Sequence, residues 1–329
     1  MTLRVAVQMD PMDAINIAGD SSFALMLAAQ ARGYAIWHYL PHDLTWEQGG
    51  EQDGDEGNLT AHAHSVEHVE RTPGAHYRFG PQTRIDLGRD VDVVLMRQDP
   101  PFDLGYITAT HLLERIAHRT LVVNDPASVR NAPEKLFVLD YARFMPPTMI
   151  TRSADDARAF LAKHGAIVVK PLHGNGGKAI FKVEADGANL ASLIELFNAM
   201  WVEPHMVQAF LPQVTQGDKR IVLVDGEVTG AINRIPGAGE IRSNLAAGGS
   251  AQATELTDTE RAICAALGPE LKARGLLFVG IDVIGGRWLT EINVTSPTGI
   301  MAIDGFNGTD TASVIWDAIE ARLAVRGQG

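Results

Sequence analysis

The chain has 329 residues, 46% of them hydrophobic and 21% charged, and its formal net charge is −12. This composition predicts a globular protein of two or three domains and excludes the disordered and fibrous classes. The negative charge argues against nucleic acid or an anionic membrane as the main partner, because both attract positive surfaces. No apolar stretch reaches the roughly 18 to 20 residues of a membrane helix, and the single cysteine, Cys264, cannot form an internal disulfide, so we expect a cytoplasmic protein.

Strand and helix patterns alternate in the first third of the chain. Asp20 and two serines precede an apolar run that ends at Gly33, which predicts an N-capped helix. A polar, glycine-rich stretch over 46–80 predicts loops and short hairpin strands. The alternation as a whole predicts an open, mostly parallel sheet. Its expected strands are 3–9, 34–39, 91–96 and 120–124, with a second helix over 106–118.

Two prolines and several turn-forming residues over 125–133 predict a domain boundary before the next helix. Beyond it we expect strands and hairpins together with five helices. The expected helices are 135–144, 153–164, 190–200, 257–274 and 311–326.

The segment 278–294 predicts a β-hairpin. Gly285 and Gly286 stand between two apolar runs, a strong signal for a two-residue turn. With that turn Ile284 faces Arg287. The same register makes Asp282 face Leu289 and Gly280 face Glu291, and it puts Trp288 and Thr290 on the core face.

The other face of this hairpin carries the oxygen-bearing side chains of Asp282, Glu291 and Asn293. Diagonal neighbours across two strands lie roughly 7 to 8 Å apart, so the two carboxylates can reach a shared cation. Their hard oxygen atoms suit magnesium. The alternative is an ordinary solvated face of an antiparallel sheet.

A glycine loop follows the apolar strand 167–170. Its glycines allow a backbone to approach a phosphate closely, although the spacing fits neither a Walker loop nor a Rossmann turn. Lys170 ends this buried-looking strand, and a buried lysine is costly unless an anion meets it. A flexible hairpin tip is the alternative.

The segment from Arg234 to Gly249 contains few bulky residues and many glycines and alanines. It predicts either a mobile surface loop or a lid that brings Arg234 and Arg242 over an anionic substrate. Arg220, on a strand just after a turn, adds another fixed positive group.

These motifs, in this order, resemble those of ATP-grasp ligases and, more narrowly, of the prokaryotic glutathione synthetase family. The resemblance covers nearly the whole chain. It rests on MDPMDAINIAGDSSFAL, VVLMRQDPPFD, NDPASVRNAPEKLF, KPLHGNGG, GDKRIVLVDGE, RIPGAGEIRSNLAAGG, GLLFVGIDVI and LTEINVTSPTGI.

The resemblance implies a fold of mixed α/β and α+β class, an ATP-grasp fold with an N-terminal open parallel-sheet domain. That domain would span 1–130, a central subdomain with the glycine loop 131–211, and a C-terminal subdomain with the metal site and the lid loop 212–329. The implied reaction joins γ-glutamylcysteine to glycine with ATP and either Mg²⁺ or Mn²⁺, through an acyl phosphate. The implied partners are these small molecules, with neither nucleic acid nor membrane, and the implied assembly is a homotetramer.

The resemblance also implies roles for individual residues. Asp282, Glu291 and Asn293 would hold the metal, and Arg220 would face the transferring phosphate. The nucleotide would be bound by Lys135, Lys170, Gly174, Asn175, Gly176, Gly177, Gln208, Phe210, Leu211 and Asp218. The dipeptide would be bound by Arg97 and the segment 10–22, including Ser22, with Arg234, Arg242 and Asn244 contributed from the lid.

Two positions depart from the family pattern. Ile300, Met301 and Ala302 stand where the family commonly has an arginine or glutamine followed by glutamate, and Ala209 replaces a polar residue of the adenine strand. Two alternatives stay open, a different ATP-grasp carboxylate–amine ligase and a non-catalytic ATP-binding protein on the same fold.

Overall fold

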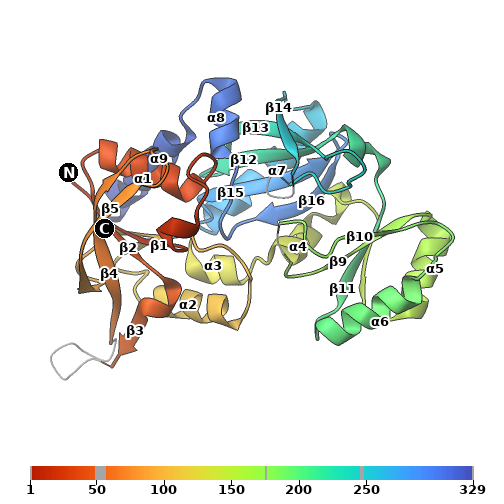
Figure 1. Cartoon of the computed structure of the whole chain (residues 1–329), viewed down its shortest axis with the longest axis horizontal. Helices are drawn as coiled ribbons and strands as arrows, with labels where there is room; N and C mark the ends of the chain where they lie inside the picture. Colours follow the sequence, from red (N-terminus) through yellow and green to blue (C-terminus); the bar gives the residue numbers. More distant parts are fainter. Residues whose placement is uncertain (1, 49–56, 175, 245–247, 328–329) are drawn as a thin grey trace.

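The structure is a computed structural model that describes residues 2–48, 57–174, 176–244 and 248–327. Within these ranges the strands form three sheets, which follow one another along the long axis of the molecule (Figure 1).

The first sheet has the strand order β3-β4-β2-β1-β6-β7, with β5 paired to β4. The pairs β2-β1, β1-β6 and β6-β7 are parallel, so the four predicted strands form the expected parallel arrangement. The sheet as a whole is mixed, because β4 pairs antiparallel with β2, β3 and β5. The predicted cap is also confirmed, because the Asp20 carboxylate accepts a hydrogen bond from the Phe23 N–H at 2.6 Å. The elements of this part are β1 (Arg4–Gln8), α1 (Ser21–Ala31), β2 (Ala35–Tyr39), β3 (Leu44–Glu47), β4 (Asn58–Val69), β5 (Tyr77–Asp86), β6 (Val93–Met96), α2 (Leu104–Glu114), β7 (Leu121–Val123) and α3 (Pro126–Arg130).

The prediction of hairpin strands over 46–80 is confirmed, but the prediction that these strands are short is wrong. Strand β4 is 12 residues long and pairs antiparallel with β5, which is 10 residues long. Both strands carry many polar residues, and most of β5 is exposed or half-buried, so an apolar alternation does not mark them. Residues 49–56 of the acidic tract lie outside the described residues.

The second sheet has the order β10-β9-β11-β8, and its neighbouring strands are antiparallel. Helices α5 and α6 pack on it, and the predicted bounds of α6 are confirmed. Most of its buried apolar residues form a cluster of their own, while Met206 of β11 belongs to a core cluster of the rest of the chain. The elements are β8 (Thr148–Thr151), α5 (Ala154–His164), β9 (Ile167–Pro171), β10 (Phe181–Val183), α6 (Leu190–Met200) and β11 (His205–Ala209).

The third sheet has the order β14-β13-β12-β15-β16. It shares its two hydrophobic clusters with the first sheet, and Asn124 at the end of β7 joins the two sheets. The Asn124 side-chain amide donates to the Phe278 and Val294 carbonyls, both at 2.7 Å. The elements are β12 (Asp218–Val224), β13 (Glu227–Ile235), β14 (Ser250–Ala253), α7 (Asp258–Ala273), β15 (Phe278–Ile284), β16 (Trp288–Asn293), α8 (Ile300–Asn307) and α9 (Thr311–Arg326).

The short helix α4 (Glu134–Phe137) connects the first sheet to the second and leads into the 3-10 helix Val138–Phe144. Further 3-10 helices are Met12–Ala14, Pro41–Asp43 and Pro212–Gln216. None of the helices in the described ranges is long and apolar enough to span a membrane.

Helix α8, which the sequence did not predict, contains the departure from the family pattern. Ile300 is buried in the core that the first and third sheets share. The Met301 sulfur accepts a hydrogen bond from the Arg71 guanidinium at 3.0 Å. This segment therefore makes contacts within the chain itself.

Candidate active site

A cavity of about 430 Å³ lies between the second and third sheets. Its lining includes β9, the end of β11, β12, β13, the β15-β16 hairpin and the start of α4. Most of the predicted site residues therefore meet in one place, although they come from positions between 134 and 293.

The β15-β16 hairpin places Asp282 directly opposite Glu291, with Gly280 opposite Asn293. The predicted two-residue turn and its register are wrong, because Ile284 pairs with Trp288 and the register shifts again between Val283 and Asp282. The turn thus holds three residues, Gly285 to Arg287, and a bulge separates Leu289 from Glu291. The bulge restores the alternation, so the three oxygen-bearing side chains share a face as predicted.

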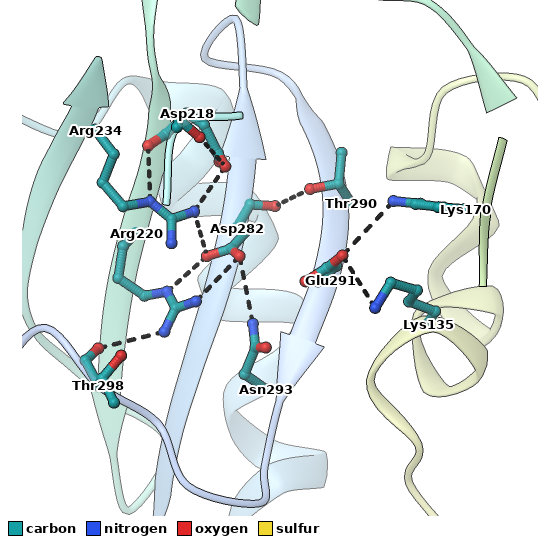
Figure 2. Close-up of polar contacts among 11 residues, drawn as sticks. Lys135, Lys170, Asp218, Arg220, Arg234, Asp282, Thr290, Glu291, Asn293 and Thr298 are labelled. Carbon is teal, nitrogen blue, oxygen red and sulfur yellow. Dashed lines mark hydrogen bonds and ion pairs between the residues drawn. The ribbon is translucent and has the colours of Figure 1, made fainter. Parts of the chain in front are cut away.

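Asp282 is buried at the centre of an ion-pair network (Figure 2). Its carboxylate accepts hydrogen bonds from Arg220 at 2.6 and 3.1 Å, and Arg234 Nη2 lies 3.0 Å from it. Burial alone would raise the pKa of Asp282, but the two arginines outweigh burial and hold this pKa well below its usual value. Asn293 Nδ2 is 3.5 Å from the same carboxylate.

Glu291 is the second carboxylate of the hairpin and faces two lysines from other elements. Glu291 Oε1 lies 3.4 Å from Lys135 Nζ and 3.7 Å from Lys170 Nζ. Burial raises the pKa of Glu291, but the two lysines outweigh it and the net shift is downward. Burial lowers the pKa of Lys170, and Glu291 opposes that shift. The buried lysine of β9 therefore has the anionic neighbour that the sequence predicted it to need.

Asp218 links the arginine of β13 to the following loop. Its carboxylate accepts hydrogen bonds from Arg234 at 2.6 Å and from the Ser243 hydroxyl at 2.8 Å. Its Oδ1 atom is buried without a hydrogen-bond partner in the described part of the chain. Burial raises the pKa of Asp218 to about 6, although Arg234 opposes it.

Arg234 belongs to the regular strand β13 and is buried, so the prediction that a mobile lid carries it is wrong. Arg242 and Asn244 do lie on the connection between β13 and β14, and both line the cavity. The Arg242 guanidinium donates to Glu240 at 3.0 Å. Residues 245–247 of the predicted lid lie outside the described residues.

Three glycines of the loop between β9 and β10, Gly174, Gly176 and Gly177, line the cavity. The Gly174 carbonyl accepts a hydrogen bond from Lys135 Nζ at 2.6 Å. Gly177 has a φ of +75°, and a Cβ there would lie 2.7 Å from Asn244 Oδ1, so only glycine fits this place without strain. Asn175, also predicted to bind the nucleotide, lies outside the described residues.

Gln208, Phe210 and Leu211, predicted to lie beside the adenine, also line the cavity. The backbone N–H groups of Ala209 and Phe210 donate to the Pro147 and Ala166 carbonyls, both at 2.9 Å. These two N–H groups are therefore already used within the chain.

Neither Arg97 nor Ser22 is among the described residues that line the cavity. Both are buried, and the Arg97 guanidinium donates to the Ser22 hydroxyl at 3.0 Å and to the Pro297 carbonyl at 2.8 Å. In this structure Arg97 ties the end of β6 to the loop after β16, and its predicted contact with a dipeptide stays a prediction.

Sequence reasoning missed several lining residues, among them Asp99, Glu134 and the loop Thr295 to Gly299. Glu134 accepts a hydrogen bond from the Thr295 hydroxyl at 3.0 Å, and burial raises its pKa to about 6 against the opposing charge of Lys135. Two signals were available, because Glu134 precedes a predicted site lysine and the loop directly follows Asn293.

Three sheets with a cation-lined cavity between the second and third define an ATP-grasp protein. Solved structures agree on this fold. D-cycloserine synthetase DcsG is 17% identical, with a TM-score of 0.68 over 97% of this chain and 99% of that one. An ATP-grasp ligase, PsnB, is 19% identical, with a TM-score of 0.61 over 98% of both chains.

Family models give the narrower assignment. The N-terminal domain of prokaryotic glutathione synthetase matches residues 3–130, and its ATP-grasp domain matches residues 134–308. Glutathione synthetase of Rhodopseudomonas palustris is 57% identical over 98% of this chain and all of its own length, and that of Vibrio vulnificus is 43% identical over 98% and 99%. The chain belongs to the prokaryotic glutathione synthetase family. It is an ATP- and divalent-metal-dependent ligase that forms a peptide bond.

Proposed function

We propose that this protein joins the cysteinyl carboxylate of γ-glutamylcysteine to the amine of glycine, using ATP and Mg²⁺, and forms glutathione, ADP and phosphate. The observation that carries the proposal is the set of buried cations that line the cavity. They are Lys135, Lys170, Arg220 and Arg234.

Such a set suits phosphoryl transfer, which asks mainly for positioning and for neutralisation of charge. Lys135 and Lys170 stand beside the glycine loop and Glu291, where they would bind the nucleotide phosphates. Arg220 and Arg234 stand together at Asp282, where they would face the transferring phosphate and the dipeptide carboxylate. An arginine fork can bind two oxygens of a carboxylate or phosphate at once.

The metal ligands we propose are Asp282, Glu291 and Asn293. Their donor set fits the group, because opposed carboxylates and an amide oxygen are the hard ligands that Mg²⁺ prefers, and Mn²⁺ accepts the same ligands. Both carboxylates have lowered pKa values, Asp282 against the effect of burial through its arginines and Glu291 through its lysines, so both are ionised at neutral pH. A divalent ion bound there neutralises charge on the phosphate oxygens.

The reaction needs no protein nucleophile. A carboxylate oxygen of the dipeptide attacks the γ-phosphorus of ATP, and the bond from this phosphorus to the bridging oxygen breaks as ADP leaves. The amine nitrogen of glycine then attacks the acyl carbon and loses a proton to solvent, and the acyl C–O bond breaks as phosphate leaves. Arg242 and Asn244, which contact the glycine loop, would cover the reacting groups and exclude water.

The remaining roles follow the positions in the cavity. Gln208, Phe210 and Leu211 would surround the base, and Asp218 would approach the ribose with its unpartnered oxygen. Arg97 and Ser22, which lie outside the set of described lining residues, would contribute to binding of the dipeptide.

The direct test is ADP release by the purified protein with ATP, Mg²⁺, γ-glutamylcysteine and glycine, each omitted in turn. We expect release only with the complete mixture, and mass spectrometry should identify glutathione as the product. Release that does not need γ-glutamylcysteine but needs another acceptor pair would assign a different ATP-grasp ligase.

The metal site has its own test. Glu291→Gln should abolish turnover while the far-ultraviolet circular dichroism spectrum stays that of the wild type, since the change keeps the side-chain shape. Rates with Mg²⁺ and Mn²⁺ at equal concentration identify the preferred ion. A wild-type rate in this variant contradicts the ligand assignment.

We also propose a homotetramer in the cytoplasm, the first from the family resemblance and the second from the single cysteine. Cys264 is buried, and burial raises its pKa to about 12, so this thiol is inert. Light scattering of the purified protein measures the subunit number, and a monomer would contradict the assembly.

A further inference from the structure

His173, the residue before the first glycine of the glycine loop, stacks on Phe102 of the N-terminal part of the chain. The ring centroids are 5.8 Å apart and the ring planes are inclined by 25°. Offset aromatic pairs at this separation attract each other beyond their burial. The contact therefore ties the central subdomain directly to the segment that follows β6.

Phe102 sits in a segment that is fixed on both sides. Its ring packs on Tyr106 of α2, with centroids 5.3 Å apart. Upstream, the Asp99 N–H donates to the Asp10 carboxylate at 2.8 Å. Asp99 and Pro100 line the cavity, so the position of Phe102 is linked to that of the cavity wall.

His173 is held in place through its ring, which contacts Phe102. Its Nδ1 atom is buried and has no hydrogen-bond partner among the residues that the structure describes. Burial lowers the pKa of His173, so the ring is neutral at pH 7 and stacks as an ordinary aromatic group. The next residue, Gly174, is held from the other side, since its carbonyl accepts the hydrogen bond from Lys135.

We propose that His173 is a positioning residue, which fixes the glycine loop relative to the segment 99–102. Through this contact, bound ATP and bound dipeptide each strengthen the binding of the other. The inference rests on the proposed function, because it takes ATP to lie under the glycine loop and the dipeptide to lie against Asp99 and Pro100. Coupling of this kind is reciprocal by thermodynamic linkage.

Calorimetry measures the coupling. The dissociation constant of the non-hydrolysable analogue AMP-PNP with Mg²⁺ is determined with and without saturating γ-glutamylcysteine, in the wild type and in His173→Ala and His173→Phe. A stack of this kind supports a ratio of roughly twofold to tenfold in the wild type. We expect His173→Ala to bring the ratio close to one and His173→Phe to keep it, because phenylalanine retains the ring.

The chain offers a matched control in His164. Its ring contacts Phe160 in the same subdomain, with centroids 4.4 Å apart, but both residues lie outside the set that lines the cavity. His164→Ala removes a histidine–phenylalanine contact of the same kind and should keep the wild-type ratio. In steady-state assays His173→Ala should raise the KM values for ATP and the dipeptide more than it lowers kcat.

Three results overturn the inference: a wild-type ratio of one, an unchanged ratio in His173→Ala, or a ratio lost equally in His173→Phe. If the wild type does not bind γ-glutamylcysteine, the proposed function fails and the inference fails with it. Binding of both ligands without coupling overturns the inference alone.

Discussion

Asp282→Asn tests the two buried ion pairs that Asp282 forms with Arg220 and Arg234. The substitution removes the charge that Arg220 contacts at 2.6 and 3.1 Å, and leaves this arginine the Thr298 carbonyl at 3.3 Å. Arg234 loses its contact at 3.0 Å but keeps Asp218 at 2.6 Å. One buried guanidinium is therefore left without a carboxylate, and the other is not.

Removing one partner of a buried ion pair costs about 3–5 kcal/mol, because the remaining charge stays buried. Since Arg234 retains Asp218, we expect the low end, a loss of about 3 kcal/mol in the free energy of unfolding. Urea denaturation at pH 7 without nucleotide, followed by circular dichroism, measures this quantity. Turnover should be lost as well, since Asp282 is a proposed metal ligand.

The control makes the same chemical change at the surface. Asp317 lies 2.7 Å from Arg32, and its side chain is 70% exposed, so Asp317→Asn should change stability by less than about 1 kcal/mol. If Asp282→Asn and Asp317→Asn destabilise the protein equally, the buried network does not carry the charge balance that the distances indicate.

Three further predictions concern pH, the glycine loop and the metal. Burial raises the pKa of Asp225, but hydrogen bonds from Lys272 and Arg322 outweigh burial and hold this pKa below its usual 3.8. The ionised Asp225 side chain therefore stabilises the fold above pH 3.8, and this stabilisation is lost as the pH falls through the folded-state pKa. Asp225→Asn should therefore lower the free energy of unfolding by about 1 kcal/mol at pH 7. Urea denaturation curves should show that the difference from the wild type shrinks progressively below pH 3.8. A difference that stays constant with pH would contradict this prediction. Gly177→Ala should weaken ATP binding roughly tenfold in calorimetry, because a strained backbone and the clash with Asn244 displace the loop; wild-type affinity would show that the loop adapts. Chelation of divalent metal should stop ADP release, Mg²⁺ should restore it, and release in excess chelator would refute the metal requirement.

The β15-β16 hairpin shows what the alternation of side chains along a strand can predict and what it cannot. It correctly put Asp282, Glu291 and Asn293 on one face, because the third residue of the turn and the bulge at Thr290 each shift the register by one residue. The two shifts together return Glu291 and Asn293 to the predicted face. The pairing itself failed, because two glycines permit turns of more than one length. Leu289, assigned to the polar face, is buried opposite Val283.

The partners in the ion pairs of the cavity could not be predicted from the sequence, for a different reason. Lys170 and Glu291 are far apart in the chain, and nothing local indicates that Lys135 meets the same carboxylate. The need of a buried lysine for an anion was predictable, but not the partner. Arg234 was assigned to a flexible loop because glycines follow it, whereas hydrogen bonding along β12 keeps it in a strand.

The charges of the cavity explain why such a costly network is kept. The described lining residues include six cations and five carboxylates. The cations are Lys135, Lys170, Lys178, Arg220, Arg234 and Arg242, and the carboxylates are Asp99, Glu134, Asp218, Asp282 and Glu291. Buried ion pairs contribute little net stability compared with apolar residues of the same size, so their retention indicates another use. Because the two sets differ by one charge only, the phosphates of ATP alone would leave the cavity with excess negative charge. A divalent cation arriving with the nucleotide would reduce that excess. Asp282 and Glu291, which hold the arginines and lysines in this structure, are the carboxylates we propose as its ligands.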